Sequence, residues 1–258
     1  MGPPEPREAM TTVEKRRGIV SCLRAEPHDT RDLVDALGAS RSTVYRGTRE
    51  LEALRLIEQV DGSYALTTFG RAVAESYFSF SDDLETLCDL QPSLSALPRE
   101  VDIPTHVLAG AAVVHATAHD PDRPVTAFER VVRNADRLIG FSPIPRSRYI
   151  DLFSDELLAG TLDADLVTTS EVVEYMLSEY DALLTDVFAV ENFRFFATTD
   201  PLLLELMVVE APREFLTVSL YDEQKHMRAF LTNDDSAAVS WGRAQFERYR
   251  ENATLVNA

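Results

Sequence analysis

The sequence predicts an α+β chain in which a small domain of three helices and a β-hairpin precedes a larger α/β domain. Three observations lead to this prediction. The 258 residues, 45% of them hydrophobic, are enough for two globular cores. In roughly the first quarter of the chain, apolar residues recur with the periodicity of helices, and one dipeptide is typical of a β-hairpin turn. Helix-like and strand-like segments then alternate and end in a run of three strands, which is typical of a mixed sheet covered by helices.

Charge is distributed unevenly along the chain. The formal net charge is -18, yet residues 11–80 hold ten basic and ten acidic side chains. Residues 81–258 hold 14 Lys or Arg against 31 Asp or Glu, and only two basic residues of the whole chain are lysines. Such an acidic, lysine-poor composition resembles that of proteins from salt-loving archaea, so we expect a halophilic source. The neutral part, with its clustered arginines, is expected to meet a polyanion.

The N-terminus and the cysteines indicate a cytoplasmic protein. Residues 1–10, MGPPEPREAM, have no apolar segment after their charges, so we interpret them as a disordered leader and not as a secretory signal. The longest apolar run, residues 107–114, is too short for a membrane helix, and no membrane partner is expected. Cys22 and Cys88 lack CxxC partners, which indicates reduced thiols and neither a disulfide nor a metal site.

Residues 11–67 are predicted to form the first domain. A first helix spans residues 12–25, because its apolar residues follow one helical face. A second helix starts at Thr30, a suitable N-cap, and ends at Gly38, where a left-handed conformation is expected.

A third helix, residues 40–54, starts at Ser40 as its N-cap. The short connection GAS and the polar N-terminal half of this helix are typical of a helix-turn-helix, whose second helix enters the major groove of DNA. Arg46 and Arg49 share a face, and each could bond a guanine edge or a phosphate. The residues expected to contact DNA are Arg31, Ser40, Arg41, Ser42, Thr43, Tyr45, Arg46, Arg49, Gly62 and Ser63.

Residues 56–67, LIEQVDGSYALT, contain the dipeptide Asp61-Gly62, which is a strong hairpin signal. A hairpin directly after a recognition helix is the wing of a winged helix. It carries Glu58 and Asp61 but no Arg or Lys, so only the backbone amides of Gly62 and Ser63 are expected to touch phosphate. The alternative interpretation is a protein-binding module whose third helix exposes a solvated basic face.

Residues 68–91 are predicted to form a linker helix. Its apolar residues are spaced 4, 3, 4 and 3, which is a two-heptad seam. The seam consists of Val73, Tyr77, Phe80, Leu84 and Leu87. It fits a dimerisation helix, which would set two winged domains on a two-fold operator. It fits equally a connector helix that packs on its own C-terminal domain, because two heptads do not distinguish the two.

Residues 100–258 are predicted to form an α/β sandwich. The expected helices span 125–136, 148–158, 169–184 and 234–251, and the expected strands span 137–142, 164–169, 193–199, 204–211, 215–222 and 227–233.

Ligands of open α/β sheets bind beyond the carboxyl ends of the strands. These ends offer a set of hydroxyl groups that we take as the expected effector site: Ser142, Tyr149, Thr168 and Tyr221. Helix capping and ordinary turns explain some of the same hydroxyls without a ligand.

Motifs for catalysis are absent from the sequence. It contains no GxSxG, no HExxH and no phosphate-binding glycine loop. His115 and His119 have the i, i+4 spacing of metal ligands on a helix, but a surface loop is the expected place for them. We therefore predict no catalytic residue, no cofactor and no metal, with a diverged phosphodiesterase-like enzyme as the alternative.

Residues 40–70, SRSTVYRGTRELEALRLIEQVDGSYALTTFG, resemble winged-helix regulators of archaea and bacteria. The segments IGFSPIPRSRYIDLF, LTVSLYDEQKHMRAFLTNDDSAAVSWG and QFERYRENA resemble the C-terminal sensor domain of archaeal winged-helix regulators, a group named after a methanogenesis regulator of filamentous methanogens. The resemblance implies a homodimeric transcriptional regulator that binds double-stranded DNA. It also implies a phospholipase-D-like fold used to sense a small molecule or a partner.

The resemblance has two departures. Phospholipase-D chemistry needs a histidine nucleophile with a lysine two residues later, and none of the five histidines has one, so no enzyme activity is expected. Residues 223–225 replace the more usual tight glycine turn between the last two strands, so a different turn is expected there.

Overall fold

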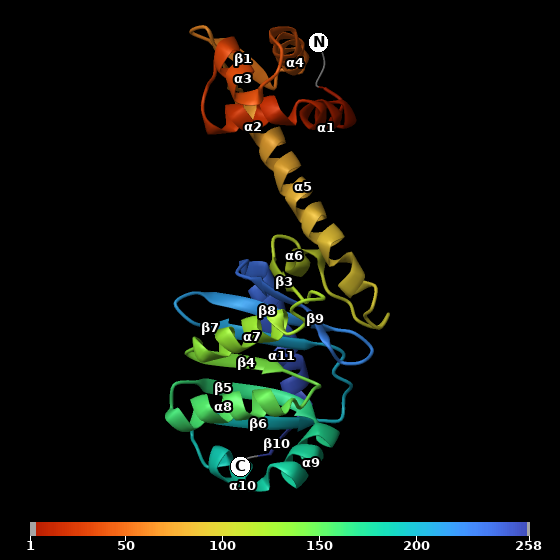
Figure 1. Ribbon diagram of the computed structural model, residues 1–258, viewed down its shortest axis with the longest axis vertical. Helices are drawn as coiled ribbons and strands as arrows, with labels where there is room; N and C mark the ends of the chain where they lie inside the picture. The colour runs from red at the N-terminus through yellow and green to blue at the C-terminus, as the bar shows by residue number, and fades with distance from the viewer. Residues whose placement is uncertain (1–3, 257–258) are drawn as a thin grey trace. The chain divides into compact units, whose positions relative to one another are not determined.

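The structure, a computed structural model, describes residues 4–256. The chain divides into two compact units, residues 1–83 and 84–258, and the division falls within one long helix. The expected fold class is confirmed: a helix-turn-helix with a hairpin, then a long helix, then an α/β domain with a mixed sheet (Figure 1). Among the described residues no helix is long and apolar enough to cross a membrane.

The described part of the first unit, residues 4–83, contains four helices, a hairpin and the beginning of a fifth helix. They are α1 (Pro6–Lys15), α2 (Arg17–Ala25), α3 (Thr30–Leu37), α4 (Arg41–Ala53), β1 (Ile57–Val60), β2 (Ser63–Leu66) and α5 (Thr68–Leu94). Their apolar faces share one core, in which Leu33, Leu51 and Leu56 are fully buried.

The N-terminal segment corrects two predictions. Residues 1–3 lie outside the described residues, but residues 6–10 are helical, so the prediction of a disordered leader is wrong for them. Pro6 fits the first helical position, and Ala9 and Val13 are buried, which holds this amphipathic turn on the core. The single helix expected at 12–25 is two helices, because the backbone leaves the helical conformation at Arg16.

The turn between α3 and α4 follows from its capping residues. Asp29, and not the expected Thr30, caps α3: its carboxylate accepts hydrogen bonds from the amides of Arg31 and Asp32. A carboxylate is also favoured by the helix dipole at this end. Gly38 ends α3 with φ of 59°, a left-handed conformation that glycine adopts without steric cost. Ser40 caps α4, as predicted.

The hairpin forms where the sequence predicts it. β1 pairs with β2 so that Val60 faces Ser63, and the two-residue turn has φ of 51° at Asp61 and 85° at Gly62. Positive φ at both turn residues is the type I′ geometry that suits the twist of a hairpin. Tyr64 and Leu66 of β2 point into the core, which gives the hairpin one buried face.

The second unit is built on an eight-stranded sheet with strand order β10-β6-β5-β4-β7-β8-β9-β3. β4, β5 and β6 run parallel, and all the other neighbours are antiparallel. The strands are β3 (Ala112–His115), β4 (Arg137–Phe141), β5 (Asp163–Thr169), β6 (Phe193–Thr198), β7 (Glu205–Glu210), β8 (Glu214–Tyr221), β9 (Met227–Asn233) and β10 (Thr254–Leu255).

Helices cover both faces of this sheet (Figure 1). The helices are α6 (Thr105–Leu108), α7 (Arg123–Arg133), α8 (Ser147–Ala159), α9 (Ser170–Glu179), α10 (Asp181–Phe188) and α11 (Ser236–Glu251). One core lies between the sheet and α11, with Phe141 and Phe246 buried, and the end of α5 adds Leu90 to it. The other core lies under α7, α8 and α10, with Phe128 and Phe230 buried.

The helix expected at 169–184 is two helices, because the chain breaks at Tyr180. α6, β3 and β10 were not predicted. β3 pairs with β9 and β10 pairs with β6 at the two edges of the sheet, so long-range pairing and not local pattern creates them. The linker helix expected at 68–91 continues to Leu94, past Pro92 in its last turn.

Candidate functional site

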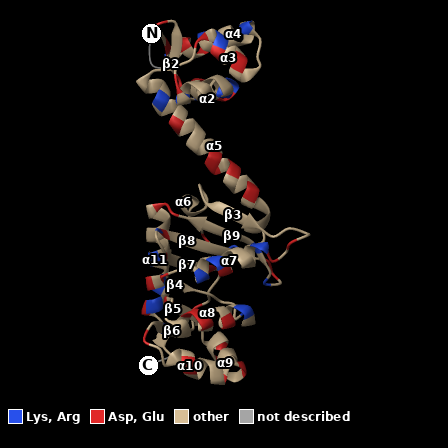
Figure 2. Ribbon diagram, turned by 60° about the vertical axis from the view of Figure 1, so that its left-hand side comes forward, with Lys and Arg blue, Asp and Glu red and all other residues tan. Residues whose placement is uncertain are grey.

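The first candidate site is the outward face of α4. Val44, Gly47 and Thr48 of this helix are buried against the core. A Cβ on Gly47 would lie 2.4 Å from Ile19, so glycine permits close packing of α4 on α2. The opposite side chains are all exposed: Arg41, Ser42, Thr43, Tyr45, Arg46 and Arg49. Figure 2 shows basic residues on this part of α4, whereas α5 carries mainly acidic ones.

Two of the α4 arginines are held by their own helix. Arg49 donates from Nε to the hydroxyl of Tyr45 at 3.2 Å, and its guanidinium lies 5.4 Å from the centre of that ring. Arg46 donates to the carbonyl of Ser42 at 3.4 Å, a weak contact. Arg49 also has an acidic neighbour, Glu52, at 3.6 Å. Within residues 4–256 no acidic side chain forms an ion pair with Arg41 or Arg46, so both guanidinium groups face solvent.

The other predicted DNA contacts are in different situations. The hydroxyl of Ser40 accepts from the amide of Thr43, so it serves the helix cap. Arg31 lies at the start of α3 with its side chain 88% exposed, 3.8 Å from Asp35. Gly62 is exposed and Ser63 half-buried at the tip of the hairpin.

One ion pair that the sequence did not predict ties α4 to the N-terminal helices. Arg16 donates from Nε and Nη2 to the two carboxylate oxygens of Glu50, both at 2.8 Å, and Lys15 adds a contact of 3.1 Å. These donors lower the pKa of Glu50 to about 2. The break between α1 and α2 therefore places Arg16 where its guanidinium forms a bidentate ion pair, called the clamp below, with Glu50 of α4, the helix that carries the exposed arginines.

The predicted seam of α5 divides into three parts. Val73 and Tyr77 pack on the core of the first unit, and Leu87 packs on a core of the second unit. Phe80 and Leu84 are exposed, at 53% and 43%. An apolar groove lies beside the first part of the helix, lined by residues of α1 and α5 that include Met10, Phe69, Val73, Tyr77 and Phe80.

The second candidate site is a group of polar side chains at one edge of the large sheet. Glu205, the first residue of β7, is buried. Its Oε2 accepts a hydrogen bond of 2.6 Å from Ser142, directly after β4. Its Oε1 accepts bonds of 2.6 Å from Ser219 and 3.0 Å from Tyr221, both on β8. Three hydroxyl donors thus surround one buried carboxyl group.

Two more residues complete this group. Arg146, just before α8, lies 5.3 Å from the centre of the Tyr221 ring and donates to the carbonyl of Lys225. Tyr149, in the first turn of α8, is 6% exposed. Burial raises the pKa of the Glu205 carboxyl, while the hydroxyl donors and Arg146 oppose that rise. Burial and the nearby Glu205 also raise the pKa of Tyr149 above its ordinary value.

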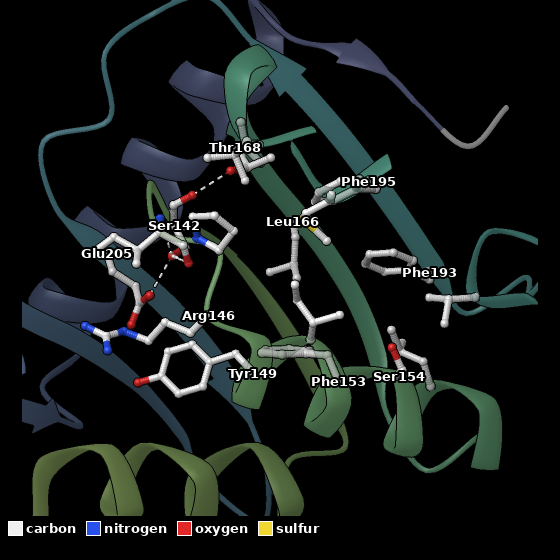
Figure 3. Close-up of a pocket in the computed structure, with 18 of the residues that line it drawn as sticks. Ser142, Arg146, Tyr149, Phe153, Ser154, Leu166, Thr168, Phe193, Phe195 and Glu205 are labelled. Atoms are coloured by element: carbon white, nitrogen blue, oxygen red, sulfur yellow. Dashed lines mark hydrogen bonds between the residues drawn. The ribbon is translucent and has the colours of Figure 1, made fainter. Parts of the chain in front are cut away.

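A cavity of about 90 Å³ lies beside these polar residues. Its polar end has Ser142, Arg146, Tyr149 and Glu205, and Thr168 donates to the carbonyl of Ser142 at 2.8 Å. Figure 3 shows these residues on one side of the cavity. The remainder of the lining is mainly apolar and comes from α7, α8, α9, α10 and the strands: Phe128, Ile150, Phe153, Leu166, Met176, Leu184, Val187, Phe193 and Phe195.

The structure brings together the four residues of the expected effector site, since Ser142, Tyr149 and Thr168 line the cavity and Tyr221 bonds Glu205. Glu205 itself was missed. The signal was one acid inside the otherwise apolar run of residues 202–209. An acid that interrupts a buried strand needs a partner and is a candidate functional group.

The histidines do not form a metal site. His115 ends β3 and donates from Nε2 to the carboxylate of Asp89 at 2.6 Å, while His119 lies in the following loop. The two residues therefore do not share a helix. Among residues 4–256 no group of His, Cys, Asp and Glu has the arrangement of a metal site.

Solved structures with a similar course of the chain have low sequence identity. TrmBL2, described as an archaeal chromatin protein with a novel mode of DNA binding, is 13% identical, covering 92% of this chain and 91% of its own, with a TM-score of 0.44. NucT from Helicobacter pylori is 6% identical over 57% of this chain and 98% of its own, with a TM-score of 0.43. Nuc from Salmonella typhimurium, a phospholipase D family member, is 8% identical over 57% and 99%, with a TM-score of 0.42.

Family models match most of the chain. Residues 5–87 match the model described as HVO_A0261 N-terminal domain. Residues 121–252, half of the chain, match the model described as methanogenesis regulatory protein FilR1, middle domain. No curated protein matches the sequence. The chain thus belongs to the family of the methanogenesis regulatory protein FilR1 middle domain.

Proposed function

We propose that this protein is a DNA-binding transcriptional regulator of the winged helix-turn-helix class, with α4 in the major groove and the second unit as a sensor of a small molecule. The observation that carries the proposal is the exposed face of α4, where Arg41, Arg46 and Arg49 stand within three helical turns. Membership in a family named after a regulatory protein supports the regulatory role.

The geometry of α4 suits base readout. Its N-terminal end carries the cap Ser40 and the exposed hydroxyls of Ser42 and Thr43, and helix N-termini with free amides bind phosphate. Arg46 and Arg49 lie about one turn further along the same face. Arginine is the side chain that bonds a guanine edge in bidentate fashion. Ser40 contributes through the cap, because its hydroxyl is already bonded.

The wing has a smaller part in this proposal. Glu58 and Asp61 are exposed on the hairpin, and both would repel phosphate. The amide of Gly62 at the tip is the remaining group for a backbone contact. We therefore assign the affinity for duplex DNA mainly to α4.

We also propose that two copies associate through the exposed apolar residues at the middle of α5. Phe80 and Leu84 are large apolar side chains left in water on a helix whose flanking turns pack into cores. A second copy that covers them would supply the two-fold symmetry that an operator with two half-sites needs. Light scattering would give a dimer mass for the wild type and a monomer mass for Phe80→Arg combined with Leu84→Arg.

The second unit is proposed to bind its ligand without converting it chemically. This expectation follows from the sequence, in which no histidine has a lysine two residues later. Release of nitrophenol from bis(p-nitrophenyl) phosphate, lost on Glu205→Gln, would contradict it and favour the phosphodiesterase alternative.

Selection of duplexes from a random pool by the purified full-length protein in molar potassium chloride tests the DNA-binding proposal. Enrichment of one sequence, protected over one or two half-sites in a footprint, is the expected result. A pool that stays random would overturn the assignment of α4 and favour a protein-binding module.

A further inference from the structure

Two buried hydrogen-bonding groups at the polar end of the cavity make no well-formed hydrogen bond among the described residues, although the hydroxyl of Tyr149 lies close to that of Tyr221. They are the hydroxyl of Tyr149 and the Nε of Arg146. Tyr149 is 6% exposed, and its ring is held against Phe128 at a centroid distance of 4.6 Å, so the hydroxyl cannot turn away into solvent. Buried polar groups in native proteins are nearly always bonded. Both groups can donate, so an acceptor oxygen is the partner that satisfies them together.

The rest of the cavity suits an apolar group. Leu166, Phe193 and Phe195 lie on the side opposite Glu205 and Arg146 (Figure 3). The volume is about 90 Å³, against roughly 150 Å³ for a cavity that holds benzene. If the number of carbon atoms scales with cavity volume, this cavity admits an apolar group of about four carbon atoms where the larger one admits the six of benzene.

The charges at the polar end favour a neutral head group. One cation, Arg146, and one carboxyl group, Glu205, line the cavity. Arg148, which could have added positive charge, is paired with Glu129 on α7. The positive charge of Arg146 favours the ionised form of Glu205, so these two charges already offset each other, and either a cationic or an anionic ligand would leave a net charge in the site. Uncompensated charge in a buried site is costly.

We propose that this cavity binds a small neutral molecule with a carbonyl oxygen on a branched or linear group of about four carbon atoms, the oxygen accepting from Tyr149 and Arg146. The proposal rests on the proposed function in one respect, since it takes the cavity as the effector site. Arg146 also donates to the carbonyl of Lys225 in the turn between β8 and β9, and so links the start of α8 to that turn. A ligand oxygen that accepts from Arg146 would give this linking residue a further hydrogen-bond partner.

Isothermal titration of the full-length protein with three probes that share one tail tests the proposal. The probes are isovaleramide, which is neutral, isovalerate, which is anionic, and isoamylamine, which is cationic. Isovaleramide is expected to bind at least about tenfold more tightly than either ion at pH 7. Octanamide, whose tail exceeds the cavity, is expected to bind more weakly than isovaleramide.

Three variants locate the binding. Tyr149→Phe removes the unpaired hydroxyl but keeps the ring, and is expected to weaken isovaleramide about five- to tenfold. Leu166→Trp places a larger side chain in the cavity and is expected to abolish binding. Leu166 is half-buried and packs against the core under α8, so the variant is used only if its thermal unfolding midpoint matches that of the wild type. The matched control is Tyr175→Phe, a tyrosine on α9 that is 46% exposed and does not line the cavity. It is expected to leave the affinity unchanged.

Tighter binding of either ion, or isovaleramide binding that survives Leu166→Trp, would overturn the proposal. Absence of heat for all probes would overturn it as well and would mean that water satisfies Tyr149 and Arg146. The selection of duplexes described above measures DNA binding in the absence of the titration ligands. Failure of the ligand proposal therefore leaves a positive selection intact, whereas failure of DNA binding leaves the titration intact.

Discussion

The hydroxyl of Ser142 donates to Oε2 of Glu205 at 2.6 Å and so joins two residues that are 63 positions apart. The pairing of Phe141 with Leu206 in the adjacent antiparallel strands puts them opposite each other just beyond β4 and at the start of β7. Ser219 and Tyr221 reach the same carboxyl group from β8. One acid thus links three neighbouring strands at the edge of the sheet that holds the cavity.

Glu205→Gln is expected to change the pH dependence of stability. Burial raises the folded-state pKa of Glu205 above its unfolded value of about 4.3. The folded state then binds the proton more tightly, so the stabilising effect is complete below about pH 4.3 and is lost as the pH rises through the folded-state pKa. Urea unfolding at several pH values should show this loss in the wild type and not in the variant. If the stability of the wild type and of the variant changed with pH in the same way, the raised pKa of Glu205 would be contradicted.

The pair of substitutions Arg46→Ala and Arg49→Ala is expected to weaken binding to the selected duplex, because each base contact contributes about 1–3 kcal/mol. Fluorescence anisotropy at fixed salt measures the change. Arg130→Ala with Arg213→Ala removes the same charge from exposed positions of the second unit and serves as the control. Equal losses for both pairs would show a general charge effect and not readout by α4.

Binding to duplex DNA is expected to depend only weakly on salt. Residues 11–80 have no net charge, and the hairpin carries acids, so few phosphates are neutralised. A plot of log affinity against log potassium chloride concentration should have a slope no steeper than about -4, which corresponds to about four phosphate contacts. A slope near -8 would contradict this account and the proposal of a salt-adapted regulator.

Acid is expected to loosen the first unit through Glu50. Its folded-state pKa of about 2 lies below the unfolded value near 4.3. The clamp with Arg16 and Lys15 therefore stabilises the fold above about pH 4.3 and loses its effect as the pH falls toward 2. Because the Glu50 side chain is 37% exposed, the contribution is about 0.2–1 kcal/mol. The thermal unfolding midpoint of Glu50→Gln should equal that of the wild type at pH 2 and should be lower than that of the wild type at pH 6.

Lys225→Gly is expected to leave the fold intact and to raise its stability by up to about 1 kcal/mol. Lys225 has φ of 64°, a left-handed conformation that costs a residue with a side chain about 1–2 kcal/mol. Glycine removes this cost but adds entropy to the unfolded chain, which offsets part of the gain. Glu223→Gly, in the same turn without positive φ, is the control and is expected to destabilise. Urea unfolding compares the two.

Much of the first unit could be predicted from the sequence because its signals are local. Gly38 and the Asp61-Gly62 turn act through their own backbone conformation, and Ser40 caps its own helix through its hydroxyl. The apolar spacing of α4 defines its buried face. The same logic located β4 to β9, whose apolar runs are bounded by breaks. The helix at Pro6–Lys15 escaped prediction because its stability comes from packing Ala9 and Val13 on a core formed later in the chain.

The sequence by itself determined the Ser40 cap, the turns at Gly38 and Asp61-Gly62, and the exposed arginines of α4, since each depends on residues within a few positions of one another. Only the tertiary structure decided that Glu205 meets Ser142 and Tyr221, that Tyr149 and Arg146 retain unpaired groups beside an apolar cavity, and that Arg16 clamps Glu50. These hydrogen bonds join residues 16 to 63 positions apart, and strand register together with helix packing sets which side chains meet.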